Sequence, residues 1–105
     1  LMIREAKRLP PGREVKVAGL PIRPHRPPTK SGRTVAFFSV EDETGLIDVT
    51  VFEDVYHRYG HLLFGDAVGA LLVCGRLEKR GALASITASA IEGLEGNGTR
   101  TLGLL

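Results

Sequence analysis

Five stretches of the chain alternate between apolar and polar residues, which is the pattern of β-strands with one buried face. They predict strands over residues 14–22, 34–41, 46–52, 68–78 and 83–91. Gly19 interrupts the first alternation, and a glycine inside a strand predicts a bulge or a sharp bend. Residues 53–63 instead place apolar side chains at helical spacing behind two acidic residues, so they predict one short helix.

Three segments between these elements carry the residue types that turns require. Residues 24–33 hold three prolines and a Ser31-Gly32 step, which predicts a loop with a stiff base and a turn at its tip. Glu43-Thr44-Gly45 and Lys79-Arg80-Gly81 predict two tight hairpins. The order strand, strand, strand, helix, strand, strand is that of the OB-fold. We therefore expect an all-β, five-stranded Greek-key barrel with one short helix between strands three and four.

The two ends of the chain are predicted to lie outside this barrel, which covers residues 13–93. Residues 1–9 favour a helix but stop at Pro10-Pro11-Gly12, so residues 1–12 predict the end of a helix or a linker. Residues 94–105 are rich in glycine and have no period, which predicts a flexible tail.

Length and composition exclude several classes of protein. With 105 residues, 43% of them hydrophobic, there is room for one modest core but hardly for a deep catalytic cleft as well. The apolar runs are far shorter than the ~20 residues of a membrane span. A single cysteine and the lack of a signal-type opening segment predict a cytoplasmic protein. No G-x-S-x-G, P-loop or Rossmann fingerprint occurs, so we expect no catalysis, cofactor or small-molecule substrate.

Two groups of residues have the composition of a metal site. Glu41-Asp42-Glu43 is acidic, but neighbouring residues of a strand point in opposite directions, which favours a solvated turn and cap. His57 and His61 have the spacing of two metal ligands on a helix, but a third ligand and the intervening glutamate of a zinc motif are missing. We therefore expect no metal site.

Charge is segregated along the chain, although its net charge is only +2. Residues 1–33 hold nine basic and two acidic residues, whereas residues 41–66 hold seven acidic and one basic. A second basic group follows at Arg76, Lys79 and Arg80. If folding joins the two basic groups, they form a stripe that binds polyanions; a solvated surface without a partner is the alternative.

The predicted barrel places an aromatic residue between the basic segments. OB-folds bind ligands across strands two and three, between the loops that join strands one to two and four to five. If Phe38 points into the barrel, Phe37 and Ser39 point out; the opposite orientation of the two phenylalanines is the alternative. Exposed rings stack on bases while cations bind phosphates, which favours single-stranded nucleic acid. The predicted contacts are Arg23, Arg26, Lys30, Arg33, Phe37, Ser39, Arg76, Lys79 and Arg80.

Four segments taken in order resemble one known family. They are VKVAGLPIR (15–23), RPPTKSGRTVAFF (26–38), VEDETGLIDVTVF (40–52) and VCGRLEKRG (73–81). Together they resemble the OB-fold domain of the bacterial DNA polymerase III α subunit, a C-family DNA polymerase. One departure is Glu53, which stands where many relatives carry proline after the aromatic residue of strand three and leaves the start of the helix open.

The resemblance implies a domain outside the polymerase palm that guides single-stranded template towards the active site during DNA replication. The palm, thumb and fingers are absent, so this chain is not expected to polymerise DNA by itself. Single-stranded DNA and other domains or subunits of the polymerase are the partners that the resemblance implies. Two alternatives stay open: a domain that docks other proteins of the assembly, and an anticodon-type tRNA-binding OB-fold in which Phe37 and Asp48 would read bases.

Overall fold

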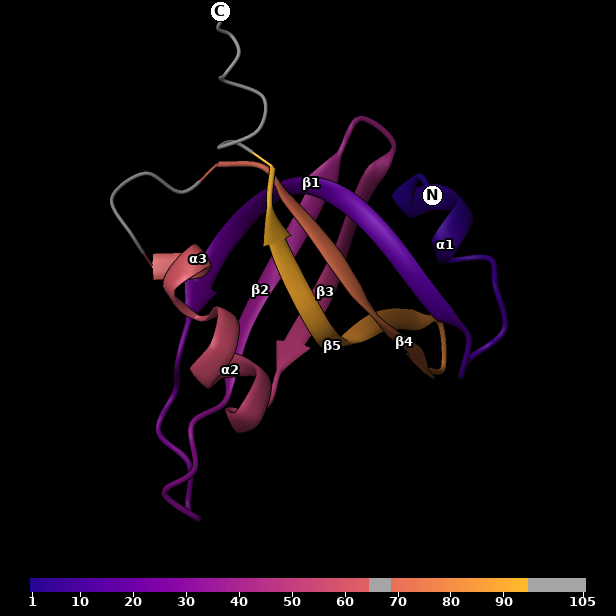
Figure 1. Ribbon diagram of the computed structural model, residues 1–105. Helices are drawn as coiled ribbons and strands as arrows, with labels where there is room; N and C mark the ends of the chain where they lie inside the picture. The colour runs from indigo at the N-terminus through magenta and orange to yellow at the C-terminus, as the bar shows by residue number, and fades with distance from the viewer. Residues whose placement is uncertain (65–68, 95–105) are drawn as a thin grey trace, which may run out of the picture.

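Five strands close into a barrel in the order β1-β2-β3-β5-β4 (Figure 1). The computed structural model describes residues 1–64 and 69–94. The strands are β1 (Glu14–His25), β2 (Ala36–Asp42), β3 (Gly45–Val51), β4 (Leu71–Arg80) and β5 (Leu83–Gly93). β3 and β5 close the barrel with a short parallel pairing, while the other pairs are antiparallel. The predicted all-β OB-fold barrel is confirmed.

β1 is shared between two halves of the barrel. Its first half, Glu14 to Gly19, pairs with β4, and its second half, Leu20 to His25, pairs with β2. Gly19 lies at the change of partner, where a side-chain carbon would collide with the carbonyl oxygen of Glu41. Glycine is therefore needed at this position because two backbones approach each other closely there. The irregular pairing itself lies further along, between Ile22 and His25.

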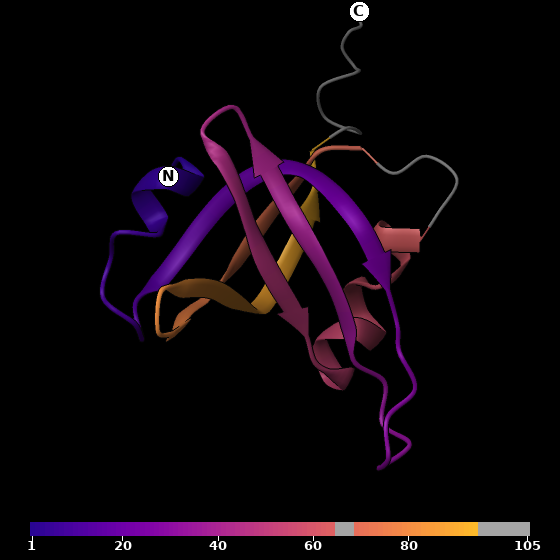
Figure 2. The same ribbon diagram turned by 180° about the vertical axis from the view of Figure 1, so that it is seen from behind.

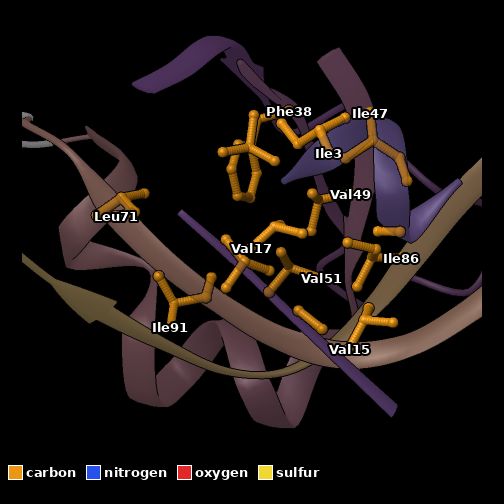
Figure 3. Packing of buried hydrophobic residues seen from close by; sticks show 14 of the residues in the cluster. Ile3, Val15, Val17, Phe38, Ile47, Val49, Val51, Leu71, Ile86 and Ile91 are labelled. Carbon is orange, nitrogen blue, oxygen red and sulfur yellow. The ribbon is translucent and has the colours of Figure 1, made fainter. Parts of the chain in front are cut away.

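Inward-facing residues of all five strands form one apolar core (Figure 3). Phe38 is 3% exposed and packs among valines, isoleucines and leucines from the other strands. Among the described residues, no charged or polar residue is buried. The alternation seen in the sequence is thus the alternation between the barrel interior and its outer face.

The single helix predicted over residues 53–63 is divided in the structure. α2 (Glu53–Tyr59) and α3 (His61–Phe64) meet at Gly60, whose backbone is packed closely against the Tyr56 ring. Tyr56 and Tyr59 are half-buried and pack against the core, as does Leu62. Among residues 1–64 and 69–94, no helix is long and apolar enough to span a membrane.

The segment before the barrel forms a short helix, α1 (Ile3–Ala6), whose Ile3 and Ala6 are fully buried in the core. α1 and the α2–α3 segment lie on opposite sides of the barrel (Figures 1 and 2). The predicted linker therefore contributes two core residues. The predicted tail lies outside the described residues from residue 95 onwards.

Asp42 fastens α1 to the turn between β2 and β3. Its carboxylate accepts hydrogen bonds from the backbone N–H of Ile3 at 2.9 Å and from the hydroxyl of Thr44 at 2.6 Å. The Thr44 hydrogen bond, helped by backbone N–H groups and opposed by burial, holds the pKa of Asp42 below its ordinary value. This residue of the acidic triplet is thus a cap, as the sequence favoured.

Candidate nucleic-acid interface

Two rows of side chains cross the outer face of the barrel from β1 to β4. Each row is a chain of directly paired residues in the order β1, β2, β3, β5, β4. The first row joins an imidazole and a benzyl ring to a cation, through His25, Phe37, Thr50, Thr87 and Arg76. The second row begins at the apolar Ile22 and continues with polar and acidic residues, through Ser39, Asp48, Ser85 and Glu78.

Two hollows lie over these rows and join into one depression, which we call the β2–β3 groove. One hollow has a volume of about 470 Å³ and includes Arg23 and His25 in its lining. The other has a volume of about 610 Å³ and reaches the β4–β5 hairpin. Both are lined by Phe37, Asp48, Thr50 and Ser85, so these residues form the middle of the groove.

Phe37 supplies an aromatic surface in the middle of the groove. It is partly exposed, whereas Phe38 is buried, so the predicted orientation of the two rings is the one observed. The ring of His25 lies beside it, with centroids 5.8 Å apart and planes tilted by 31°. Its Nδ1 is 3.0 Å from the carbonyl oxygen of Arg23. Two neighbouring rings thus offer a wider stacking surface than one.

His25 was missing from the residues predicted from the sequence. The strand was expected to end near Ile22 because Pro24 follows, but β1 continues past the proline and His25 pairs with Phe37. The backbone between them is irregular, and Arg23 adopts φ 51°, a left-handed conformation that is uncommon for a residue with a side chain. An irregularity of this kind at the rim of a barrel re-aims side chains. Here it places both Arg23 and His25 in the groove lining.

The polar row gives the groove hydrogen-bonding groups. The Ser39 hydroxyl donates to Asp48 at 2.8 Å across the β2–β3 pair. Glu78 accepts from Arg76 at 2.9 Å and from the Thr87 hydroxyl at 3.3 Å. The Arg76–Glu78 ion pair lies on the surface, so it offsets part of the positive charge predicted for this strand.

The nine predicted contact residues separate into three groups. The groove lining contains six of them, namely Arg23, Phe37, Ser39, Arg76, Lys79 and Arg80. Lys30 and Arg33 are exposed on the β1–β2 loop, which projects past the barrel (Figure 2). Arg26 points elsewhere: its guanidinium lies over the rings of Tyr56 and Phe64, 5.5 and 5.3 Å from their centroids.

Cations therefore stand at both ends of the groove, and rings and hydroxyls stand between them. Arg23 lies at the β1 end, and Lys79 and Arg80 lie at the β4–β5 end. Within the part of the chain that the structure describes, no cluster of three histidine, cysteine, aspartate or glutamate side chains is arranged to hold a metal ion. The groove can stack bases, hydrogen-bond their edges and bind phosphates at its ends.

The strand order of the closed barrel, the helical segment packed against its core and the groove across β2 and β3 define the OB-fold class of binding domains. The chain belongs to the family described as OB-fold nucleic acid binding domain, whose model matches residues 22–93.

An error-prone DNA polymerase of Symbiobacterium thermophilum is 54% identical over 95 residues, which are 90% of this chain and 9% of that protein. The resemblance to C-family polymerases is thus confirmed, and the chain spans less than a tenth of this relative. Among solved structures, the hypothetical protein ygiW from E. coli shares the fold with a TM-score of 0.63 and 16% identity, over 87% of this chain and 85% of that one. A deletion mutant of the single-stranded DNA binding protein from Thermus aquaticus shares it with a TM-score of 0.59 and 24% identity, over 76% and 40% of the two chains.

Proposed function

We propose that this chain binds single-stranded DNA along the β2–β3 groove and acts as a template-handling module of a C-family, error-prone type DNA polymerase. It is non-catalytic by itself. The observation that carries the proposal is the row of paired residues that puts two adjacent rings, His25 and Phe37, between cations at the two ends of the groove.

The groove suits a single strand better than a duplex. Stacking on Phe37 requires a base whose face is free, which a paired and stacked duplex does not offer. A duplex reader places a long helix or a two-stranded ribbon in the major groove. α2 has seven residues with acidic Glu53 and Asp54 in its first turn, so it is a poor match to the phosphate backbone.

The residues in the middle of the groove also indicate which side of the bound strand faces them. Asp48 repels phosphates, so the backbone is expected to run near Arg23, Lys79 and Arg80 while the bases face Phe37 and the hydroxyls. Lys30 and Arg33 on the projecting loop extend the cationic path beyond the groove. Stacking and phosphate contacts do not distinguish one base from another, so sequence specificity is expected to be weak.

Fluorescence anisotropy of a labelled oligo-dT of about 15 nucleotides, at two salt concentrations, tests the proposal. The same length of duplex and of single-stranded RNA are the competitors. We expect salt-sensitive binding that prefers the single strand. Equal or stronger binding to the duplex, or no binding at low salt, contradicts the proposal, and stronger binding to RNA would move it towards an RNA-binding role.

Charge-neutralising variants locate the phosphate path. Each of Lys30→Gln and Arg33→Gln should reduce the slope of log K against log salt by ~0.7 if its residue contacts one phosphate. Lys16→Gln is the matched control, because Lys16 is exposed on β1 where that strand pairs with Cys74 of β4, in the other half of the barrel. A slope that falls equally for Lys16→Gln would show only a general effect of net charge.

A further inference from the structure

Both ends of the basic β1–β2 loop are fastened to the same helical segment. After the strand ends at His25, the guanidinium of Arg26 lies over the rings of Tyr56 in α2 and Phe64 in α3. Before β2 begins, the backbone N–H of Thr34 donates to the carboxylate of Glu53, the first residue of α2, at 2.7 Å. The loop is thus held at its two ends by residues that are far away along the chain.

The part of the loop between the two attachments is closed on itself. The Thr29 hydroxyl donates to the carbonyl oxygen of Arg33 at 2.6 Å, and the Gly32 N–H donates to the carbonyl oxygen of Thr29 at 3.2 Å. Gly32 has φ 78°, the left-handed conformation that glycine adopts without strain. The preceding prolines, Pro27 and Pro28, limit the backbone further. Once its ends are fixed, this loop has little freedom left.

We propose that Glu53 and Arg26 are positioning residues for single-stranded DNA: they hold the loop so that Lys30 and Arg33 extend the cationic path of the β2–β3 groove. The inference rests on the proposed function. Glu53 would then favour the binding of a polyanion although it is acidic. A loop that has to become ordered when DNA binds lowers the affinity, and Glu53 holds the loop in place beforehand.

Electrostatics and positioning predict opposite effects for one substitution. Removing the Glu53 carboxylate raises the net charge by one, which by itself favours DNA. It also leaves the Thr34 N–H without its acceptor and frees one end of the loop. We expect Glu53→Ala to weaken oligo-dT binding about three- to ten-fold, which corresponds to the loss of about one hydrogen bond. The change should lie mainly in a faster dissociation rate.

Two further variants separate positioning from charge. Asp54→Ala makes the same change of charge one residue later in the first turn of α2, and Asp54 makes no side-chain hydrogen bond within the described residues. Asp54→Ala should therefore bind as well as or better than the unaltered chain. Glu53→Gln keeps an amide oxygen that accepts the Thr34 N–H, so it should restore most of the affinity that Glu53→Ala loses.

Limited digestion with trypsin measures how well the loop is held in the absence of DNA. Trypsin cuts after Lys30 and Arg33, and cleavage requires the loop to leave its closed conformation. We expect faster cutting at these two bonds in Glu53→Ala and in Arg26→Gln, but not in Asp54→Ala or Glu53→Gln. Circular dichroism melts of all variants show whether the barrel itself is intact.

The outcomes distinguish this inference from the proposed function. If the unaltered chain binds oligo-dT while Glu53→Ala binds equally or more tightly and is cut no faster, the positioning role is overturned and the proposed function stands. If Asp54→Ala loses as much affinity as Glu53→Ala, the effect belongs to the helix and the inference is also wrong. If the unaltered chain binds no single strand at low salt, the proposed function falls, and the inference falls with it.

Discussion

Phe37 and Phe38 are consecutive residues of one strand, yet they belong to different parts of the molecule. Phe38 is enclosed by the core, while Phe37 pairs with His25 and Thr50 on the outer face and lines the groove. The pleat of β2 alone separates them. If the proposed function is right, the inner face of this sheet serves stability and the outer face serves DNA binding. A substitution on one face should then leave the property of the other nearly unchanged.

The largest effect is expected on the inner face. Phe38→Ala removes a buried ring and should lower the free energy of unfolding by ~3–5 kcal/mol. Urea unfolding followed by far-UV circular dichroism measures this loss. Phe38→Leu is the control, since it fills most of the space and should cost much less. A cost below about 1 kcal/mol for Phe38→Ala would show that the ring does not support the core.

The same truncation one residue earlier should affect binding instead. Phe37→Ala should cost ~1–3 kcal/mol of affinity for oligo-dT at fixed salt, because a base loses its stacking surface. Anisotropy titration measures the affinity, and a urea melt of the same variant should show a much smaller change than Phe38→Ala. A variant that unfolds as readily as Phe38→Ala, or that binds as well as the unaltered chain, would break the division between the faces.

Asp42, the last residue of β2, should contribute to stability through its hydrogen bond to α1. Asp42→Asn weakens the acceptor for the Ile3 N–H and should cost about 1 kcal/mol, as the loss of a helix cap does. Because folding lowers the pKa of Asp42, its contribution is present above the unfolded-state pKa and is lost as pH falls through the folded-state pKa. The difference in stability between Asp42→Asn and the unaltered chain should therefore shrink in acid. A pH-independent difference would contradict this cause.

The smallest effect is expected from Asp48, in the middle of the groove. Asp48→Asn removes a charge that repels phosphates and should tighten oligo-dT binding by about 0.5 kcal/mol, the size of an exposed charge interaction. Glu92→Gln makes the same change of charge at an exposed position of β5 outside the groove lining. Equal tightening in both variants, measured by anisotropy at low salt, would assign the effect to net charge alone.

The inner face was predictable from the sequence, and the outer face only in part. Alternation of apolar residues locates the strands because burial requires it, and Phe38, Val40 and Val49 are buried as that alternation predicts. The groove residues Phe37 and Ser39 follow from the same period. The same period places Asp48 on the outer face, where it was a candidate base reader but not one of the predicted contacts.

Other features depend on contacts between distant segments, which no local pattern contains. His25 enters the groove through the irregular pairing between Ile22 and His25. Arg26 turns towards the rings of Tyr56 and Phe64, in the helices that follow β3. β2 begins at Ala36 rather than Thr34, and the Thr34 N–H donates to Glu53 instead of to a strand partner. Ile3 and Ala6 likewise pack into a core formed by distant strands, and Asp42, which is far from α1 in the sequence, accepts the Ile3 N–H.

β1 changes its partner strand at Gly19, so the two halves of the barrel are expected to unfold together. The first half of β1 pairs with β4, and its second half pairs with β2. Neither half of the barrel can open by itself without pulling on the strand that the other half needs. The amide protons of β2 and of β4 should then exchange with solvent through the same rare global opening, so this small barrel behaves as one foldon.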